Sequence, residues 1–66
     1  MTEEKIIAQR LREARGNRSM QVVCDAVGIS QKALIAYETG SRIPRDAIKM
    51  RLARLYGKSC AELFFY

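Results

Sequence analysis

The sequence lacks the residues on which several classes of functional site depend. Its 66 residues contain no histidine, no tryptophan and only two cysteines. The missing histidine and the shortage of cysteine exclude Cys₂His₂ and Cys₄ zinc sites, and they exclude Ser-His-Asp and Cys-His nucleophile systems. Two cysteines are also too few for a disulfide framework. The composition therefore predicts a protein that is not an enzyme and that uses no metal, no cofactor and no small-molecule ligand.

Long apolar runs and acidic residues are scarce as well. No apolar run reaches the roughly 18 residues that a membrane span needs, and the start of the chain, with Glu3 and Glu4, differs from a secretory signal. Only 7 Asp and Glu stand against 12 Lys and Arg, which gives a net charge of +5. We therefore expect a cytoplasmic protein without membrane contact, whose partner is negatively charged.

Glycine and proline divide the chain into short segments. Glycine readily adopts the left-handed conformation that often ends a helix, so four residues are candidate helix ends: Gly16, Gly28, Gly40 and Gly57. The segments between them predict helices over 3–15, 20–27, 30 to about 39, a stretch after Pro44, and a stretch that opens with a capping box at 59–62. No segment alternates with period two. The expected structure is one all-α domain over residues 1–66.

The second and third predicted helices carry the signal for function. Only about three residues, 28–30, separate an eight-residue helix from the next short helix. So short a connection makes the two helices cross steeply, as in a helix-turn-helix motif, which here spans about 19–39. The second helix of such a motif enters the major groove of DNA. The sequence thus predicts a recognition helix over 30–39.

Outward-facing side chains of this helix are candidates for contact with the bases. Since Leu34 and Tyr37 share the inward face, the candidates are Gln31, Lys32, Ile35 and Ala36. A glutamine can bond adenine through N6 and N7, and a lysine can reach guanine O6 and N7 or a phosphate. The two apolar side chains could meet thymine methyl groups, although Ile35 could instead pack on a loop or a partner chain.

Phosphate contacts are expected from the residues that flank the recognition helix. The candidates are hydroxyl groups and arginines near the helix ends: Arg18, Ser19, Ser30, Thr39, Ser41, Arg42 and Arg45. The alternative for any single arginine is simple solvation. Arg51 and Arg54 lie on the opposite side of the fourth helix from Leu52 and Leu55, and we expect them on a solvated face.

Four stretches share a pattern with one group of DNA-binding regulators. Ser19–Ser30 and Leu34–Gly40 fit the two halves of that group's helix-turn-helix, in which an aromatic, a glutamate and a glycine close the recognition helix. Ile43–Asp46 and Tyr56–Phe64 fit its fourth and fifth helices. The chain thus resembles the phage-repressor and Cro-like regulators of the xenobiotic-response-element family over about residues 6–65. The resemblance implies a five-helix lambda-repressor-like bundle that binds double-stranded DNA sequence-specifically as a transcriptional regulator, which we interpret as a repressor.

The same resemblance implies an ion pair between the first helix and the recognition helix. The matching positions are Arg15 and Glu38, and the alternative is that both are separate surface charges. A partly buried pair of this kind contributes more to structural specificity than to stability. The chain departs from the family pattern at Met20, where many members have a glutamine, and at Cys24, where alanine is usual.

The apolar end of the chain predicts a second copy as a partner. Helix-turn-helix domains usually read two-fold sites as dimers, and Phe65 and Tyr66 are our candidates for a symmetric homodimer contact. Both residues could instead fold back on their own chain. A rival hypothesis is a protein-interaction module, such as an antitoxin or an adaptor, that uses the same bundle and binds DNA only secondarily.

Overall fold

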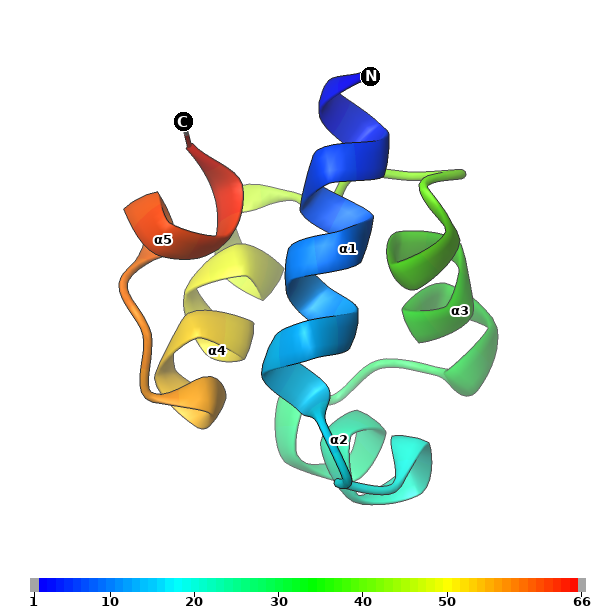
Figure 1. The fold of residues 1–66 in the computed structure, drawn as a ribbon. Coiled ribbons are helices and arrows are strands. Elements are labelled where there is room, and N and C mark those ends of the chain that lie inside the picture. Colours follow the sequence, from blue (N-terminus) through cyan, green and yellow to red (C-terminus); the bar gives the residue numbers. More distant parts are fainter. Residues whose placement is uncertain (1, 66) are drawn as a thin grey trace.

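The computed structural model describes residues 2–65, and within this range the regular structure is five helices without strands (Figure 1). The helices are α1 (Glu3–Arg15), α2 (Met20–Val27), α3 (Gln31–Thr39), α4 (Asp46–Tyr56) and α5 (Cys60–Phe64). The predicted all-α class and the predicted order of helices are confirmed. Ser30, placed at the start of the recognition helix by the sequence, is the N-cap of α3.

Side-chain hydroxyl groups begin four of these helices. Each accepts a hydrogen bond of 3.0–3.3 Å from the backbone N–H three residues further on, and the four are Thr2, Ser19, Ser30 and Ser59. Glu62 completes the predicted capping box, because its carboxylate accepts the backbone N–H of Ser59 at 2.9 Å. Such caps satisfy backbone donors that have no partner inside the helix. The helix starts are therefore encoded locally.

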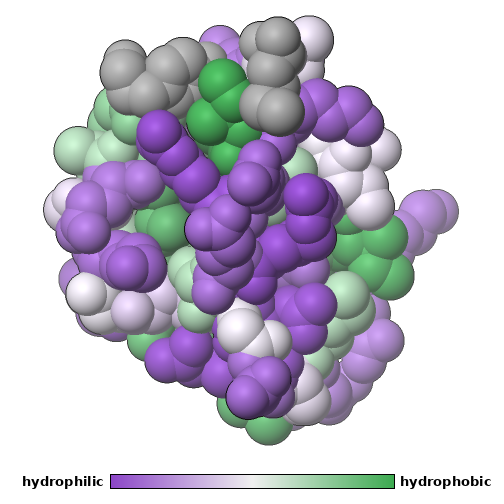
Figure 2. Space-filling view, viewed as in Figure 1, coloured by the Kyte–Doolittle hydropathy of each residue, from purple (hydrophilic) through white to green (hydrophobic). Residues whose placement is uncertain are grey.

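α1 runs through the middle of the bundle. In Figure 1 it lies between α3 on one side and α4 and α5 on the other, and it packs directly on α3 and α5, while α2 packs on α3 and α4. The most deeply buried side chains come from all five helices and include Ile7, Leu11, Val23, Leu34, Leu52, Leu63 and Phe64. Figure 2 shows that the face over α1 is mainly hydrophilic, with small hydrophobic areas at its edges.

The two helices of the predicted motif both end at glycines in the left-handed region. Gly28 has a φ of 82° and Gly40 a φ of 83°. At Gly40 the space is also restricted, since an added Cβ would lie 3.2 Å from Cδ of Lys5. Glycine at this position therefore allows the end of α3 to lie against the beginning of α1. None of the helices within residues 2–65 combines the length and the apolar character that crossing a bilayer requires.

Candidate nucleic-acid interface

α2 and α3 meet at the turn 28–30. The backbone N–H groups of Gly28 and Ile29 both donate to the carbonyl of Cys24, at 2.7 and 3.1 Å, and this fixes the direction in which the chain leaves α2. On α3, Leu34, Tyr37 and Glu38 are buried. The opposite side of α3 therefore faces solvent, as a recognition helix requires.

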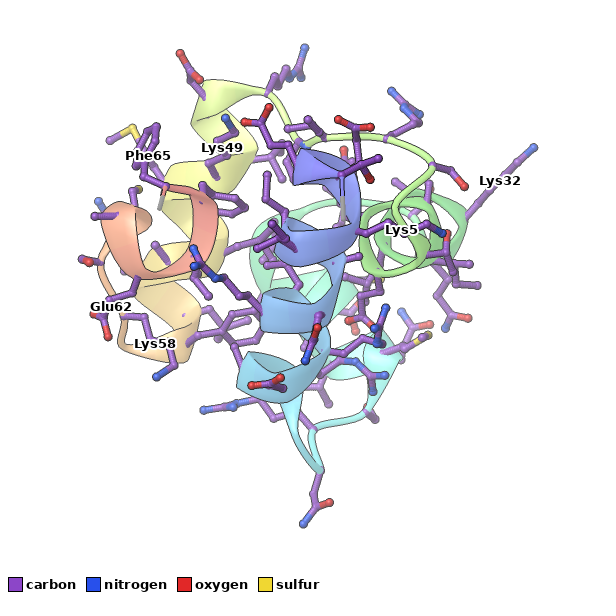
Figure 3. All side chains as sticks on the ribbon, turned by 45° about the horizontal axis from the view of Figure 1, so that its top comes forward. Lys5, Lys32, Lys49, Lys58, Glu62 and Phe65 are labelled. Carbon is purple, nitrogen blue, oxygen red and sulfur yellow. The ribbon has the colours of Figure 1, made fainter. Side chains whose placement is uncertain are left out.

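The exposed side of α3 carries the predicted base-contacting residues. Gln31 and Lys32 are exposed, Ile35 is 46% exposed and Ala36 is half-buried. Lys32 extends away from the body of the protein (Figure 3). The structure therefore places all four predicted residues on or beside one solvent-facing surface, as the helical spacing indicates.

A chain of side-chain hydrogen bonds holds Gln31. Its Nε2 donates to Oε1 of Gln21 at 2.6 Å, and Nε2 of Gln21 donates to Oδ1 of Asp25 at 2.7 Å. Gln21 was not among the predicted site residues, although its place in the first turn of α2 and its spacing of four from Asp25 are visible in the sequence. The contact with Gln31 depends on how the two helices cross, which the sequence does not give directly.

The four predicted hydroxyl groups lie at the start of α2 and at the two ends of α3. Ser19 and Ser30 accept from the N–H groups of Val22 and Ala33, which leaves each O–H proton free to donate to an anion. After α3, Thr39 Oγ1 lies 3.2 Å from Ser41 Oγ, and both residues are exposed. These four groups remain accessible for contact with a phosphate.

The predicted phosphate-binding arginines fall into two groups. Arg42 and Arg45 are exposed in the segment between α3 and α4, and their side chains make no hydrogen bond or ion pair with any of residues 2–65. Arg18 is turned elsewhere: its Nη1 donates to the carbonyl of Ala14 at 2.9 Å, and its guanidinium lies 5.5 Å from the ring centroid of Tyr56. The structure thus groups Arg42 and Arg45 beside α3 and directs Arg18 toward α1 and α4.

Arg15 and Glu38 form a bidentate ion pair that joins α1 to α3. Nε and Nη2 of Arg15 donate to the two carboxylate oxygens of Glu38 at 2.8 and 3.1 Å, and the Glu38 side chain is only 3% exposed. The hydrogen bond to Glu38 raises the pKa of Arg15 above its ordinary value. Two further contacts run from α1 to the end of α3, because Arg12 donates to the carbonyl of Glu38 and Lys5 donates to that of Thr39.

A comparison with protein families identifies the kind of domain to which this interface belongs. The helix-turn-helix family model HTH_3 matches residues 9–63. The chain belongs to the Cro/C1-type helix-turn-helix family. This confirms the resemblance and the lambda-repressor-like class of fold, and it makes the chain a non-enzymatic DNA-binding domain of transcription regulation. No curated protein and no solved structure matches the chain.

One side chain of this HTH_3 domain makes a contact that the sequence did not predict. Arg51 was predicted on a solvated face of α4 and is exposed there, and its Nη1 also donates to the carbonyl of Val27 at 3.2 Å. The same atom would lie 3.7 Å from a Cβ built on Gly28. A cation at the C-terminal end of a helix is favoured by the helix dipole, which explains the attraction of Arg51 to the end of α2. Periodicity gave the correct face of α4, but it did not show that α2 ends beside that face.

The side of the HTH_3 domain formed by α4 and α5 carries a buried hydroxyl group and two exposed apolar side chains. The Tyr56 hydroxyl is buried without a hydrogen-bond partner among residues 2–65, and burial is the main cause that raises its pKa to about 12. Phe65 is 60% exposed and Met50 58% exposed, and both line one recess with Cys60. Tyr66, the other predicted dimer residue, lies outside the described residues.

Proposed function

We propose that this HTH_3 domain acts, over residues 1–66, as a sequence-specific repressor that occupies an operator with α3 in the major groove. The observation that carries the proposal is the exposed side of α3, where Gln31 and Lys32 lie beside the unpaired cations Arg42 and Arg45. Occupancy of a promoter by such a surface is sufficient for repression. Activation would need a further contact with the transcription machinery.

Direct reading of bases is assigned to the outward residues of α3. The bond that Gln31 donates to Gln21 restricts the orientation of Gln31 before DNA arrives, which reduces the entropy lost when its amide meets an adenine. Lys32 reaches guanine or a phosphate, and Ile35 and Ala36 meet thymine methyl groups. Ser19, Ser30, Thr39, Ser41, Arg42 and Arg45 supply the phosphate contacts, and Arg18 would have to leave the Tyr56 ring to join them.

A second copy of the chain is the proposed partner in solution. The exposed apolar side chains Met50 and Phe65 line one recess on the α4–α5 side and offer a surface for a two-fold contact, in which we also include the predicted residue Tyr66. We expect Phe65→Ser to shift the protein from dimer to monomer in sedimentation equilibrium, while Val22→Ser, which removes a similarly exposed apolar side chain from α2, leaves the distribution unchanged. A wild-type monomer at all concentrations, free and on DNA, would contradict the proposed dimer.

The test of DNA reading begins with selection of a preferred site from random duplex DNA. On that site, Gln31→Ala and Lys32→Ala should each weaken binding by about 1–3 kcal/mol and relax the preference at one base position. The matched control is Lys58→Ala, an exposed lysine on the α5 side of the bundle (Figure 3).

Three outcomes would overturn the proposed function. One is wild-type affinity in both α3 variants, and another is an equal loss in the lysine control. The third is absence of duplex binding at about 50 mM salt, where phosphate contacts are strong, and it would favour the protein-interaction module. A selected site placed over a reporter promoter then tests the direction of regulation, because repression by the wild type and its loss in the α3 variants are expected.

A further inference from the structure

A recess of ≈ 380 Å³ lies beside α3, between the turn that ends α2 and the segment that leads into α4. Three arginines line it, Arg42, Arg45 and Arg51, together with Gly28 and Tyr37. No carboxylate lines this recess. All three arginines follow α3 in the sequence, two in the segment before α4 and one on α4, and the fold brings them together beside Gly28 at the end of α2.

This recess differs in charge from three other recesses in the described part of the chain. Three other recesses also contain Arg or Lys, and each includes at least one carboxylate: Asp25 in the first, Glu13 and Glu62 in the second, and Asp46 in the third. Like charges that share a site repel one another, so three cations without an acid raise the free energy of the empty recess. A bound anion would remove this repulsion.

The contacts of the three arginines leave donors for such an anion. The side chains of Arg42 and Arg45 have no partner among residues 2–65. Arg51 uses Nη1 for the carbonyl of Val27, and this bond holds its guanidinium beside Gly28 while leaving its other N–H groups available. Arginine donors fit the oxygens of a phosphate well, often through two parallel hydrogen bonds.

The position of the recess indicates the source of the phosphate. Ala33 and Tyr37 form its wall on α3, and on the helical wheel they lie next to Lys32 and Ala36 of the exposed side. The phosphates of a duplex flank the major groove, so a helix that lies in the groove has backbone phosphates along its edges.

We propose that this recess binds a phosphate of the DNA backbone and that Arg51, on α4, holds it together with Arg42 and Arg45. This inference rests on the proposed function, because it places the phosphate on the duplex that α3 reads. It adds to the interface a residue from a helix outside the helix-turn-helix. Arg51 also donates to the last residue of α2, so it connects the end of α2 to the DNA phosphate. Because α3 forms one wall of the recess, the bound phosphate would hold α2, α3 and α4 in a fixed arrangement.

The experiment compares Arg51→Met with Arg54→Met. Both variants remove one exposed positive charge from α4, but Arg54 does not line the recess. Binding to duplex DNA is measured by fluorescence anisotropy between about 50 and 200 mM salt, where each neutralised phosphate contributes about 0.9 to the slope of log affinity against log salt. Arg51→Met should lower that slope by about 0.9 and weaken binding about tenfold, whereas Arg54→Met should keep the wild-type slope.

A structural role alone for Arg51 gives a different result. Loss of its bond to Val27 would lower the melting temperature and could weaken binding, but it would not change the number of phosphates neutralised. Arg51→Lys retains the charge and should retain the slope. Equal slopes for the Arg51→Met and Arg54→Met variants would overturn the proposal.

Titration with inorganic phosphate, without DNA, distinguishes the sources of the anion. The backbone amide signals of Gly28 and Ile29 should shift saturably in the wild type and in Arg54→Met, and not in Arg51→Met. If phosphate shifts these signals while Arg51→Met leaves DNA binding unchanged, the recess serves a free phosphate-bearing molecule, and the backbone assignment is overturned. If Gln31→Ala weakens DNA binding but phosphate does not shift these signals and Arg51→Met leaves the salt slope unchanged, this proposal fails and the proposed function stands.

Discussion

Two groups of arginines, one before and one after α3 in the sequence, differ in whether their side chains have a partner within the protein. Arg12 and Arg15 reach α3 from α1 and bond to the main chain or the carboxylate of Glu38. Arg42 and Arg45 follow α3 directly in the sequence and have no side-chain partner among residues 2–65. The first group therefore holds the recognition helix in place, and the second is left for a partner outside the chain.

The difference follows from the burial of a single acid. Glu38 is 3% exposed, so its charge must be compensated inside the protein, and α1 provides that compensation. No buried acid lies along the recess beside Arg42 and Arg45. A stabilising cation and a DNA-binding cation are thus distinguished by what lies opposite them, and substitutions should separate the two effects.

The largest expected effect is on folding and comes from the buried acid. Glu38→Ala leaves the partly buried Arg15 without its partner and should lower the free energy of unfolding by about 3 kcal/mol. Urea unfolding followed by circular dichroism measures this value. The control is Glu13→Ala on α1, whose exposed side chain should contribute less than about 0.5 kcal/mol. Similar losses in the two variants would show that the ion pair does not hold α3.

The next effect is on binding and comes from the unpaired group. The double variant Arg42→Gln, Arg45→Gln should weaken binding of duplex DNA by about 2 kcal/mol, because charge-assisted bonds to phosphate are lost. Its free energy of unfolding should stay within about 0.5 kcal/mol of the wild type. The matched control removes two exposed cations elsewhere, Arg54→Gln with Lys58→Gln. A comparable loss of affinity in that control would mean that only net charge matters.

A third, smaller effect tests the buried polar region around Glu38. The Tyr56 hydroxyl is buried without a partner, so Tyr56→Phe should stabilise the protein by about 1 kcal/mol at neutral pH. The unfolded chain loses the tyrosine proton near pH 10, while the folded chain keeps it to about pH 12. The contribution of the Tyr56 proton to the free energy of unfolding is therefore fully present below pH 10 and is lost as the pH rises from 10 to 12. This part of the alkaline decline should be absent in the Tyr56→Phe variant.

Melting temperatures across that alkaline range measure the difference between the two proteins. Tyr37→Phe serves as the control, because the hydroxyl of Tyr37 is not a buried group without a partner. A gain of the same size in the control would mean that removal of any tyrosine hydroxyl has this effect.

The smallest effect comes from an acid that is exposed and locally bonded. The hydrogen bond from the Ser59 backbone lowers the pKa of Glu62 below its ordinary value. The stability from this bond is present above pH 4.5 and is lost as the pH falls through the lowered pKa. Glu62→Gln should therefore melt at a slightly lower temperature than the wild type at neutral pH and at nearly the same temperature in acid. A constant difference at all pH values would contradict this view of the cap.

Features that depend on neighbours in the sequence were the ones that the sequence predicted well. The serine caps, the glycine ends and Pro44 need only a few adjacent residues, and together with the apolar periodicity they predicted all five helices. The outward direction of Gln31 and Lys32 followed from the inward direction of Leu34 and Tyr37. Arg15 and Glu38 were paired through the family resemblance, since 23 residues separate them.

Contacts between helices were the part that the sequence did not reveal. The bond from Gln31 to Gln21, the bond from Lys5 to Thr39 and the position of Arg51 all depend on how helices cross. Helical periodicity assigns a side chain to one face of its own helix, but it does not show which other helix ends beside that face. The exposed position of Arg51 was predicted, but its bond to the end of α2 was missed for this reason.

The central position of α1 has a consequence for how this domain folds and for how it can be moved. Most helical bundles form contacts between residues close in the sequence early in folding. In this domain, α3 is held by two bonds between distant residues, Arg15 to Glu38 and Lys5 to Thr39, which close loops of 23 and 34 residues. A graft of 19–40 onto another scaffold would carry the DNA-facing side chains without the helix that holds them. The smallest segment of this protein that could be grafted as a DNA-binding unit therefore begins with α1.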